Sequence, residues 1–104
     1  MTVKFSLKAA PTFKKPVELP IHGGDAAVVV VEFKHRTRDA LDEWIKEIQG
    51  KTDAEVLAGC VVGWDLDDKC EAESFELLCQ NYAGAVRVIS QAYTDEIVQA
   101  RRKN

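Results

Sequence analysis

Residues 26–50 read AAVVVVEFKHRTRDALDEWIKEIQG, and the spacing of the hydrophobic residues changes within this stretch. In its first part, Val29, Val31 and Phe33 fall on one face of an extended chain, a period of two that indicates a half-buried strand. The run of valines supports this reading, because β-branched side chains favour an extended backbone. We therefore expect a strand over residues 26–35.

The second part of the same stretch has the spacing of an amphipathic helix. Its hydrophobic residues stand at i, i+3, i+4 and i+7 and share one helical face, namely Leu41, Trp44, Ile45 and Ile48. Thr37 is a suitable N-cap, and Gly50 can close the C-terminus. A strand followed directly by a helix indicates a fold that contains both kinds of element.

Two more strands are expected upstream of this stretch. TVKFSLKA (residues 2–9) and KPVELPI (residues 15–21) both alternate, with one face made by Val3, Phe5 and Leu7 in the first and by Val17, Leu19 and Ile21 in the second. Pro11 and Pro16 mark breaks, and since proline cannot donate to a β-ladder, the second segment is expected at a sheet edge. The glycines of HGGD (residues 22–25) supply a turn, so the sequence predicts a β-hairpin.

Three further helices are expected downstream, near residues 53–63, 71–81 and 84–101. Thr52 and Glu55 form a capping-box pattern at the start of the first, Gly63 can end it, and WDLDD then forms a connector. The sequence therefore predicts an α+β fold, in which an N-terminal β-hairpin or small antiparallel sheet precedes a bundle of three to four helices. The length of 104 residues fits a single domain over residues 1–104.

The hydrophobic faces of these elements predict the core. It should contain Val29, Val31, Phe33, Leu41, Trp44, Ile45, Ile48, Leu57, Val61, Phe75, Leu78, Ile89 and Ile97. Trp64 borders the connector and is left out of this list.

Composition and charge narrow the class of protein. The N-terminus is too short and too charged for a secretory signal, and no apolar run is long enough to cross a membrane, so we expect a cytoplasmic protein. Residues 39–86 carry three Lys or Arg and twelve Asp or Glu, which argues against nucleic-acid binding. Residues 1–38 carry seven Lys or Arg and three Asp or Glu. The basic N-terminal part of one copy could therefore attract the acidic middle of another.

Motifs for chemistry are weak in this sequence. Asp65, Asp67 and Glu76 fall at positions one, three and twelve of an EF-hand loop, but Lys69 and Cys70 occupy the fifth and sixth, where an oxygen ligand and glycine are required. We therefore expect no calcium site. The histidines and the odd number of cysteines form no catalytic or zinc-binding pattern, so no enzyme activity, metal or cofactor is expected.

Four strings in the sequence resemble the phage tail assembly chaperones of long-tailed phages and prophages. They occur in the family's order and cover nearly the whole chain: FSLKAAPTFKKPVELPIHGG, EFKHRTRDAL, VVGWDLDD and LLCQNYAGAVRVISQAY. Many relatives have proline where this chain has Ala83. FKHRTRDAL and GWDLDD are unusual strings, and their joint occurrence makes the resemblance specific.

The resemblance implies a non-enzyme that binds the tape measure protein in the host cytoplasm, keeps it soluble during tail assembly, and often self-associates. A structural phage tail or head–tail connector protein is the alternative. In many such phages a frameshift gives a longer form, and Lys103 and Asn104 fit a slippery codon pair. We assign partner binding to the alternating N-terminal segment and to the GWDLDD connector, with the candidate residues Phe5, Leu7, Trp64, Asp65 and Leu66.

Overall fold

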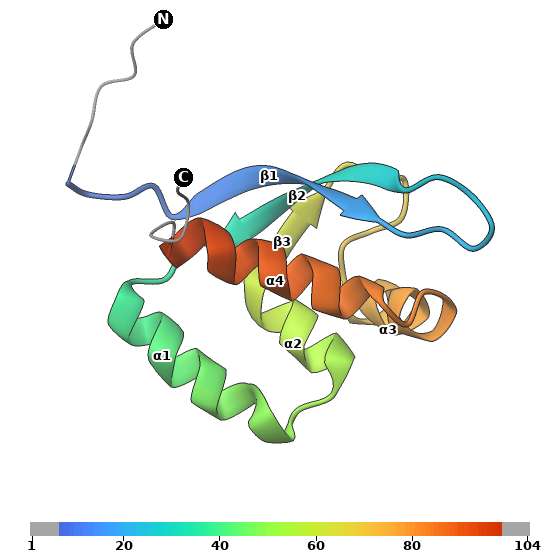
Figure 1. Ribbon diagram of the computed structural model, residues 1–104. Coiled ribbons are helices and arrows are strands. Elements are labelled where there is room, and N and C mark those ends of the chain that lie inside the picture. The colour runs from blue at the N-terminus through green and yellow to red at the C-terminus, as the bar shows by residue number, and fades with distance from the viewer. Residues whose placement is uncertain (1–6, 99–104) are drawn as a thin grey trace, which may run out of the picture.

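The computed structural model describes residues 7–98 and has the expected α+β architecture (Figure 1). Three antiparallel strands form a sheet in the order β1-β2-β3, and four α-helices complete the fold. The elements are β1 (Thr12–Leu19), β2 (Ala27–Lys34), α1 (Arg38–Glu47), a short 3-10 turn (Ile48–Gly50), α2 (Asp53–Cys60), β3 (Val61–Trp64), α3 (Ala72–Asn81) and α4 (Ala85–Val98).

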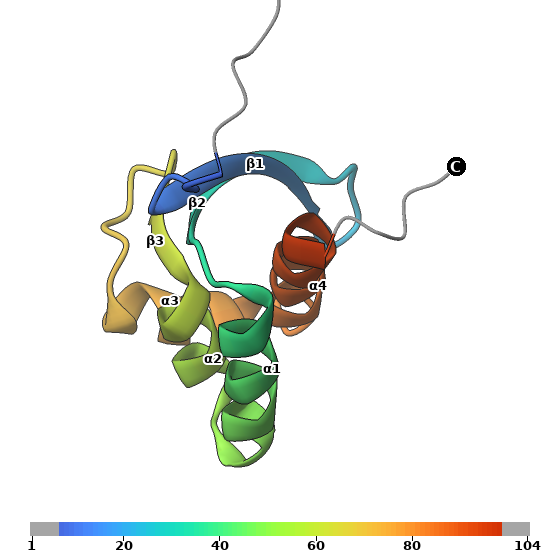
Figure 2. The ribbon, with the colours of Figure 1, turned by 90° about the vertical axis from the view of Figure 1, so that its left-hand side faces the viewer.

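The sheet is curved and covers the helices on one side only. Figure 2 shows β1 and β2 arching over the layer that contains α2 and α4. The strand face that was predicted to be buried, with Val29, Val31 and Phe33, packs into this layer together with Val17 and Leu19. The opposite sheet face is open, and Val28 on it is 62% exposed.

The hairpin forms as expected, with β1 at an edge of the sheet. Pairing runs from Thr12 opposite Lys34 to Leu19 opposite Ala27, and Gly23 in the turn has φ +69°. His35 donates its backbone N–H to the carbonyl of Pro11, the residue before β1, at 2.9 Å, so the backbone groups of Pro11 point toward β2. Because backbone groups alternate along a strand, Pro16 faces the open edge, where its missing N–H leaves no ladder bond unmade.

Two strand boundaries differ from those expected. β1 begins at Thr12, so the stretch between Pro11 and Pro16 is strand and not a break. Leu7 lies outside any strand and is 95% exposed, while the rest of the strand expected over residues 2–9 lies outside the described residues. The last residues of the helix expected over 84–101 also lie outside them, as do Lys103 and Asn104.

The helix expected over residues 53–63 is shorter than predicted, and its end is a strand. Thr52 and Glu55 form the complete capping box, but α2 ends at Cys60 and β3 follows without a connector. β3 pairs antiparallel with β2, Trp64 opposite Val31, through a register shift between Glu32 and Phe33. The hydrophobic residues of the second half of this segment therefore lie in a strand and not in a helix. The GWDLDD string connects β3 to α3 and not one helix to another.

Most of the predicted core is buried, with one clear exception. Ile45 was expected inside and is 38% exposed, because α1 projects from the helical layer and contacts it along a narrow stripe centred on Leu41 and Trp44 (Figure 2). Three others are only half-buried against the core, namely Ile48, Leu78 and Ile97. Tyr93 and Cys60 were left out of the predicted core list and are fully buried.

Arg36 ties the helical layer together at the end of β2. Its guanidinium lies 4.6 Å from the ring centroid of Trp44, and its Nη1 donates to the Gly59 carbonyl at 2.7 Å and to the Tyr93 hydroxyl at 3.1 Å. These contacts link β2, α1, α2 and α4 through one side chain. Trp44 also meets Tyr93 edge-to-face at 5.4 Å between ring centroids, which completes the cluster.

Candidate partner-binding surface

Trp64 fixes the connector between β3 and α3. Its indole Nε1 donates to the Asp68 carbonyl at 2.8 Å, and its ring meets Phe75 edge-to-face at 5.4 Å between centroids. Phe75 is buried in the first turns of α3. The half-buried Trp64 side chain therefore contacts both the connector after β3 and the first turns of α3.

Asp65 extends the sheet by one position with its side chain. Its backbone N–H donates to the Val30 carbonyl at 3.1 Å, and its carboxylate Oδ1 accepts from the Val30 N–H at 3.0 Å. In an ordinary antiparallel pair a backbone carbonyl would accept that second bond. The carboxylate takes its place, so the chain can leave the sheet at this residue without leaving Val30 unpaired.

An apolar groove lies between this connector and α3, and we call it the α3 groove. Its volume is about 230 Å³, and it is lined by Trp64, Leu66, Asp68, Ser74, Leu77, Leu78, Asn81 and Tyr82. Trp64 and Leu78 form its partly buried part, while Leu66, Leu77 and Tyr82 are exposed. The α3 groove thus places two of the predicted candidates, Trp64 and Leu66, beside hydrophobic residues of a helix.

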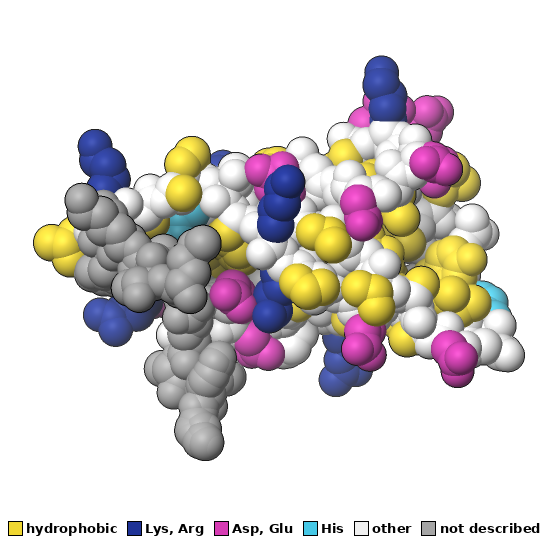
Figure 3. Space-filling model, turned by 90° about the horizontal axis from the view of Figure 1, so that it is seen from above, with side chains coloured by type: hydrophobic (Ala, Val, Ile, Leu, Met, Phe, Trp, Pro, Cys, Tyr) yellow, Lys and Arg dark blue, Asp and Glu magenta, His cyan; other side chains and the backbone are white. Residues whose placement is uncertain are grey.

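The hydrophobic surface continues toward the hairpin turn. Tyr82 lies 5.4 Å from the ring of His22, measured between centroids, and the neighbouring Ile21 is exposed. In the view from above, hydrophobic side chains gather over the middle and the right-hand part of the molecule, bordered by acidic side chains (Figure 3). The right-hand end is the one where the hairpin turn and α3 lie in Figure 1.

The segment around the α3 groove is strongly acidic. Residues 65–82 contain six Asp or Glu and one Lys. The two ion pairs seen within residues 7–98, Lys15–Glu96 and Lys46–Glu43, include none of these acids. Within the described part of the chain, these acids therefore form no ion pair, and the segment carries a net charge of −5.

A match with a protein-family model covers the whole chain. The model is that of the phage tail assembly chaperone, and it matches residues 1–104. This chain belongs to the phage tail assembly chaperone family. The family assignment implies a partner protein in tail assembly. No curated protein and no solved structure matches this family member.

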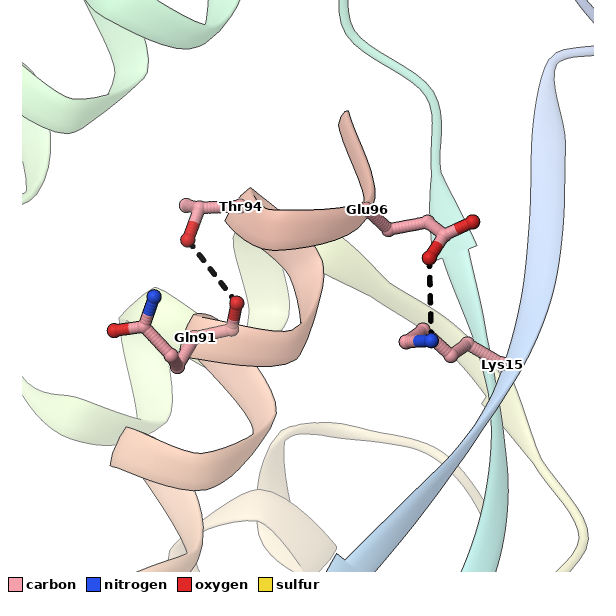
Figure 4. A network of polar contacts seen from close by, with 4 residues as sticks. All are labelled: Lys15, Gln91, Thr94 and Glu96. Atoms are coloured by element: carbon pink, nitrogen blue, oxygen red, sulfur yellow. Dashed lines mark hydrogen bonds and ion pairs between the residues drawn. The ribbon is translucent and has the colours of Figure 1, made fainter. Parts of the chain in front are cut away.

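A second groove lies between β1 and α4, and its lining residues differ in polarity from those of the α3 groove. It has a volume of about 590 Å³ and is lined by Lys15, Arg87, Val88, Gln91, Ala92, Asp95 and Glu96. Figure 4 shows Lys15 Nζ bridging to Glu96 Oε1, at 3.2 Å, and the Thr94 hydroxyl donating to the Gln91 carbonyl one turn earlier. Five of its seven lining residues are polar or charged, and Lys15 pairs with Glu96, so it is a poorer surface for an apolar partner than the α3 groove.

The two halves of the predicted partner site fare differently. Trp64 and Leu66 line the α3 groove, whereas Asp65 and Leu7 are not among its lining residues, and Phe5 lies outside the described residues. Leu77 and Tyr82 also line the groove and were not among the predicted candidates. The helical spacing of α3 could have indicated that Leu77 is exposed, because it lies off the face that carries the buried Phe75 and the half-buried Leu78.

The side chains of residues 7–98 that can bind a metal ion or act as nucleophiles include its His, Cys, Asp and Glu residues. No cluster of three or more His, Cys, Asp or Glu that could hold a metal ion occurs there. Burial raises the pKa of the Cys60 thiol to about 12, against a smaller opposing effect of Arg36, and burial also raises the pKa of Cys70 and of Cys79. The thiols are therefore poor nucleophiles at neutral pH. None of the described helices has the length and hydrophobicity of a membrane span.

Proposed function

We propose that this chain acts as a single chaperone domain over residues 1–104 that binds the tape measure protein and keeps it soluble while a phage tail assembles in the host cytoplasm. The α3 groove is the observation that carries the proposal, because exposed apolar side chains of this kind on a small protein mark an interaction site. The family assignment supports a role in phage tail assembly. The proposal that the client is the tape measure protein comes from the resemblance of the sequence to the family.

Holding is the activity that this surface supports. A client with apolar segments aggregates through those segments, and covering them removes the contact that drives aggregation. Leu66, Leu77 and Tyr82 offer hydrophobic area for that purpose, and the uncompensated acids of the connector keep the complex charged and soluble. The proposed role needs binding and no bond-breaking step, so we propose a non-enzyme.

Co-expression of this chain with the tape measure protein tests the proposal. The client should be soluble and co-elute on size exclusion only when this chain is present. Leu77→Asp should abolish co-elution, because Leu77 lines the α3 groove. Val28→Asp is the matched control and should preserve co-elution. Val28 is about as exposed as Leu77, at 62% against 60%, but it does not line the groove.

Two results would overturn the chaperone assignment. The first is a client whose solubility does not change when this chain is present. The second is this chain as a stoichiometric component of purified finished tails, found by mass spectrometry, which would favour the structural alternative.

We also propose self-association of this chain, on the ground of its charge distribution. Basic residues dominate the N-terminal third and acidic ones the middle, so one copy can attract the middle of another. Such contacts are screened over about 10 Å at 0.1 M salt. Light scattering should therefore show oligomers at low salt that become smaller at high salt, and a monomer under both conditions would contradict the proposal.

A further inference from the structure

We infer that the α3 groove takes an amphipathic helix whose apolar face is flanked by lysine or arginine. This rests on the proposed function, because it names the chemistry of the client segment that binds at the same surface. Three features of the described residues carry the inference: the kind of backbone that lines the groove, its length along α3, and the charge around it.

The lining of the α3 groove favours a helix over an extended segment. An added strand needs a sheet edge with free backbone donors and acceptors. The groove instead lies between a helix and a connector, and the indole N–H of Trp64 and the carbonyl of Asp68 already bond to each other. A helix brings its backbone hydrogen bonds with it and needs only apolar contact, which Leu66, Leu77 and Tyr82 provide.

The length of the groove fits two turns of a partner helix. Its α3 wall is made by residues three and four apart on one helical face, from Ser74 to Asn81. At about 1.5 Å per residue this wall is about 10 Å long. A partner helix therefore has room to seat apolar side chains at i, i+3 or i+4, and i+7, the spacing that helix-in-groove recognition uses.

Charge selects among such helices. Asp67 and Glu71 on the connector and Glu73 at the start of α3 have no ion-pair partner within residues 7–98. A helix with acidic flanks would add like charge at this site, whereas one with basic flanks would supply the missing cations. Because these charged side chains are exposed to solvent, their attraction for a basic helix should weaken as salt is added.

A matched pair of synthetic peptides tests the inference. Both carry the same leucine face at i, i+3, i+4 and i+7, and their polar positions are lysine in one and glutamate in the other. Fluorescence anisotropy with the full chain should show at least about tenfold tighter binding of the lysine peptide at low salt, about 1.4 kcal/mol, and a smaller difference at high salt.

Two variants locate the binding site. Leu77→Ser should weaken binding of the lysine peptide by about tenfold. Val28→Ser should leave it unchanged, because Val28 is equally exposed on the open face of the sheet. Equal binding of the two peptides, no binding of either, or an equal effect of both variants would overturn the inference. A change from dimer to monomer in Leu77→Ser without peptide binding would assign the groove to a second copy and would also overturn it.

Failure of this inference and failure of the proposed function give different results. If the tape measure protein stays soluble with this chain while neither peptide binds, the chaperone role stands and the basic-helix chemistry falls. If the lysine peptide binds at Leu77 while the tape measure protein remains insoluble, the groove recognises a basic helix of another partner and the proposed client is wrong.

Discussion

The carboxylate of Asp65 and the backbone N–H of Val30 form a 3.0 Å hydrogen bond that replaces a missing position of the β2–β3 ladder. The backbone N–H of Asp65 returns the bond to the Val30 carbonyl at 3.1 Å. The acid in the middle of GWDLDD is thereby a structural group, and it ends β3 at the point where the chain turns toward α3.

Asp65→Ala should lower the free energy of unfolding by about 1 kcal/mol, because the Val30 N–H loses its acceptor and has only water in exchange. Urea unfolding followed by circular dichroism measures this. Asp67→Ala is the matched control, since the Asp67 side chain makes no hydrogen bond or ion pair within residues 7–98, and it should change the midpoint little. Equal effects of the two variants would remove the structural role of Asp65.

Gly59→Ala should destabilise the protein by about 1–3 kcal/mol, although alanine is normally the better helix former. A Cβ at this position would lie 2.7 Å from Nε1 of Trp44, and that indole is held between Arg36 and Tyr93. Gly84→Ala, where a Cβ meets nothing within 4 Å, should be neutral or stabilising by up to about 1 kcal/mol. A stabilised Gly59→Ala protein would show that the indole can move aside.

Alkaline pH should destabilise the protein through Cys60. Its pKa is raised to about 12 by burial, so the folded state keeps the thiol proton where the unfolded state, with an ordinary pKa near 8.5, releases it. The stabilisation is complete below the unfolded pKa and is lost as pH rises toward the folded pKa, at up to about 1.4 kcal/mol per pH unit. Burial also raises the pKa of Tyr93, which adds to the loss.

The measurement is the free energy of unfolding between about pH 8.5 and 12 under reducing conditions. Cys60→Ala should be less stable at neutral pH, because it leaves a cavity, but its stability should decline less steeply with pH. The same decline in both proteins would mean that Cys60 does not contribute.

Calcium should have no effect on this protein. Asp65, the first residue of the would-be loop, already accepts from Val30, and residues 7–98 contain no cluster of acids suited to a metal ion. Titration calorimetry with calcium should therefore give no binding heat, and the melting temperature should not shift. A site of micromolar affinity would contradict both the loop chemistry and the geometry.

The alternation and helical spacing of the sequence were sufficient for the hairpin, α1, α3 and α4, because each of these elements buries one continuous face of local sequence. β3 was not predictable in the same way. Val56, Leu57, Cys60, Val61 and Trp64 satisfy a helical spacing, and what turns Val61–Trp64 into a strand is pairing with β2, about thirty residues upstream. That contact leaves no local pattern.

The candidate surface was predicted only in part, for a similar reason. GWDLDD could be singled out as a string, but the roles of Trp64 and Asp65 depend on Phe75 and Val30, which are distant in sequence. Leu77 becomes part of a surface only because α3 lies against the connector, so the groove is a property of the assembled fold.

The position of Pro16 has a consequence for how long complexes of this protein can last. Its ring interrupts the row of donors on the outer edge of β1, in the middle of the longest unpaired edge of the sheet. Shared β-ladders grow cooperatively and separate slowly, whereas side-chain contacts form and break one at a time. The β1 edge is thus poorly suited to take up a further strand, so associations at this edge have to rely on side-chain contacts, which can form and break individually.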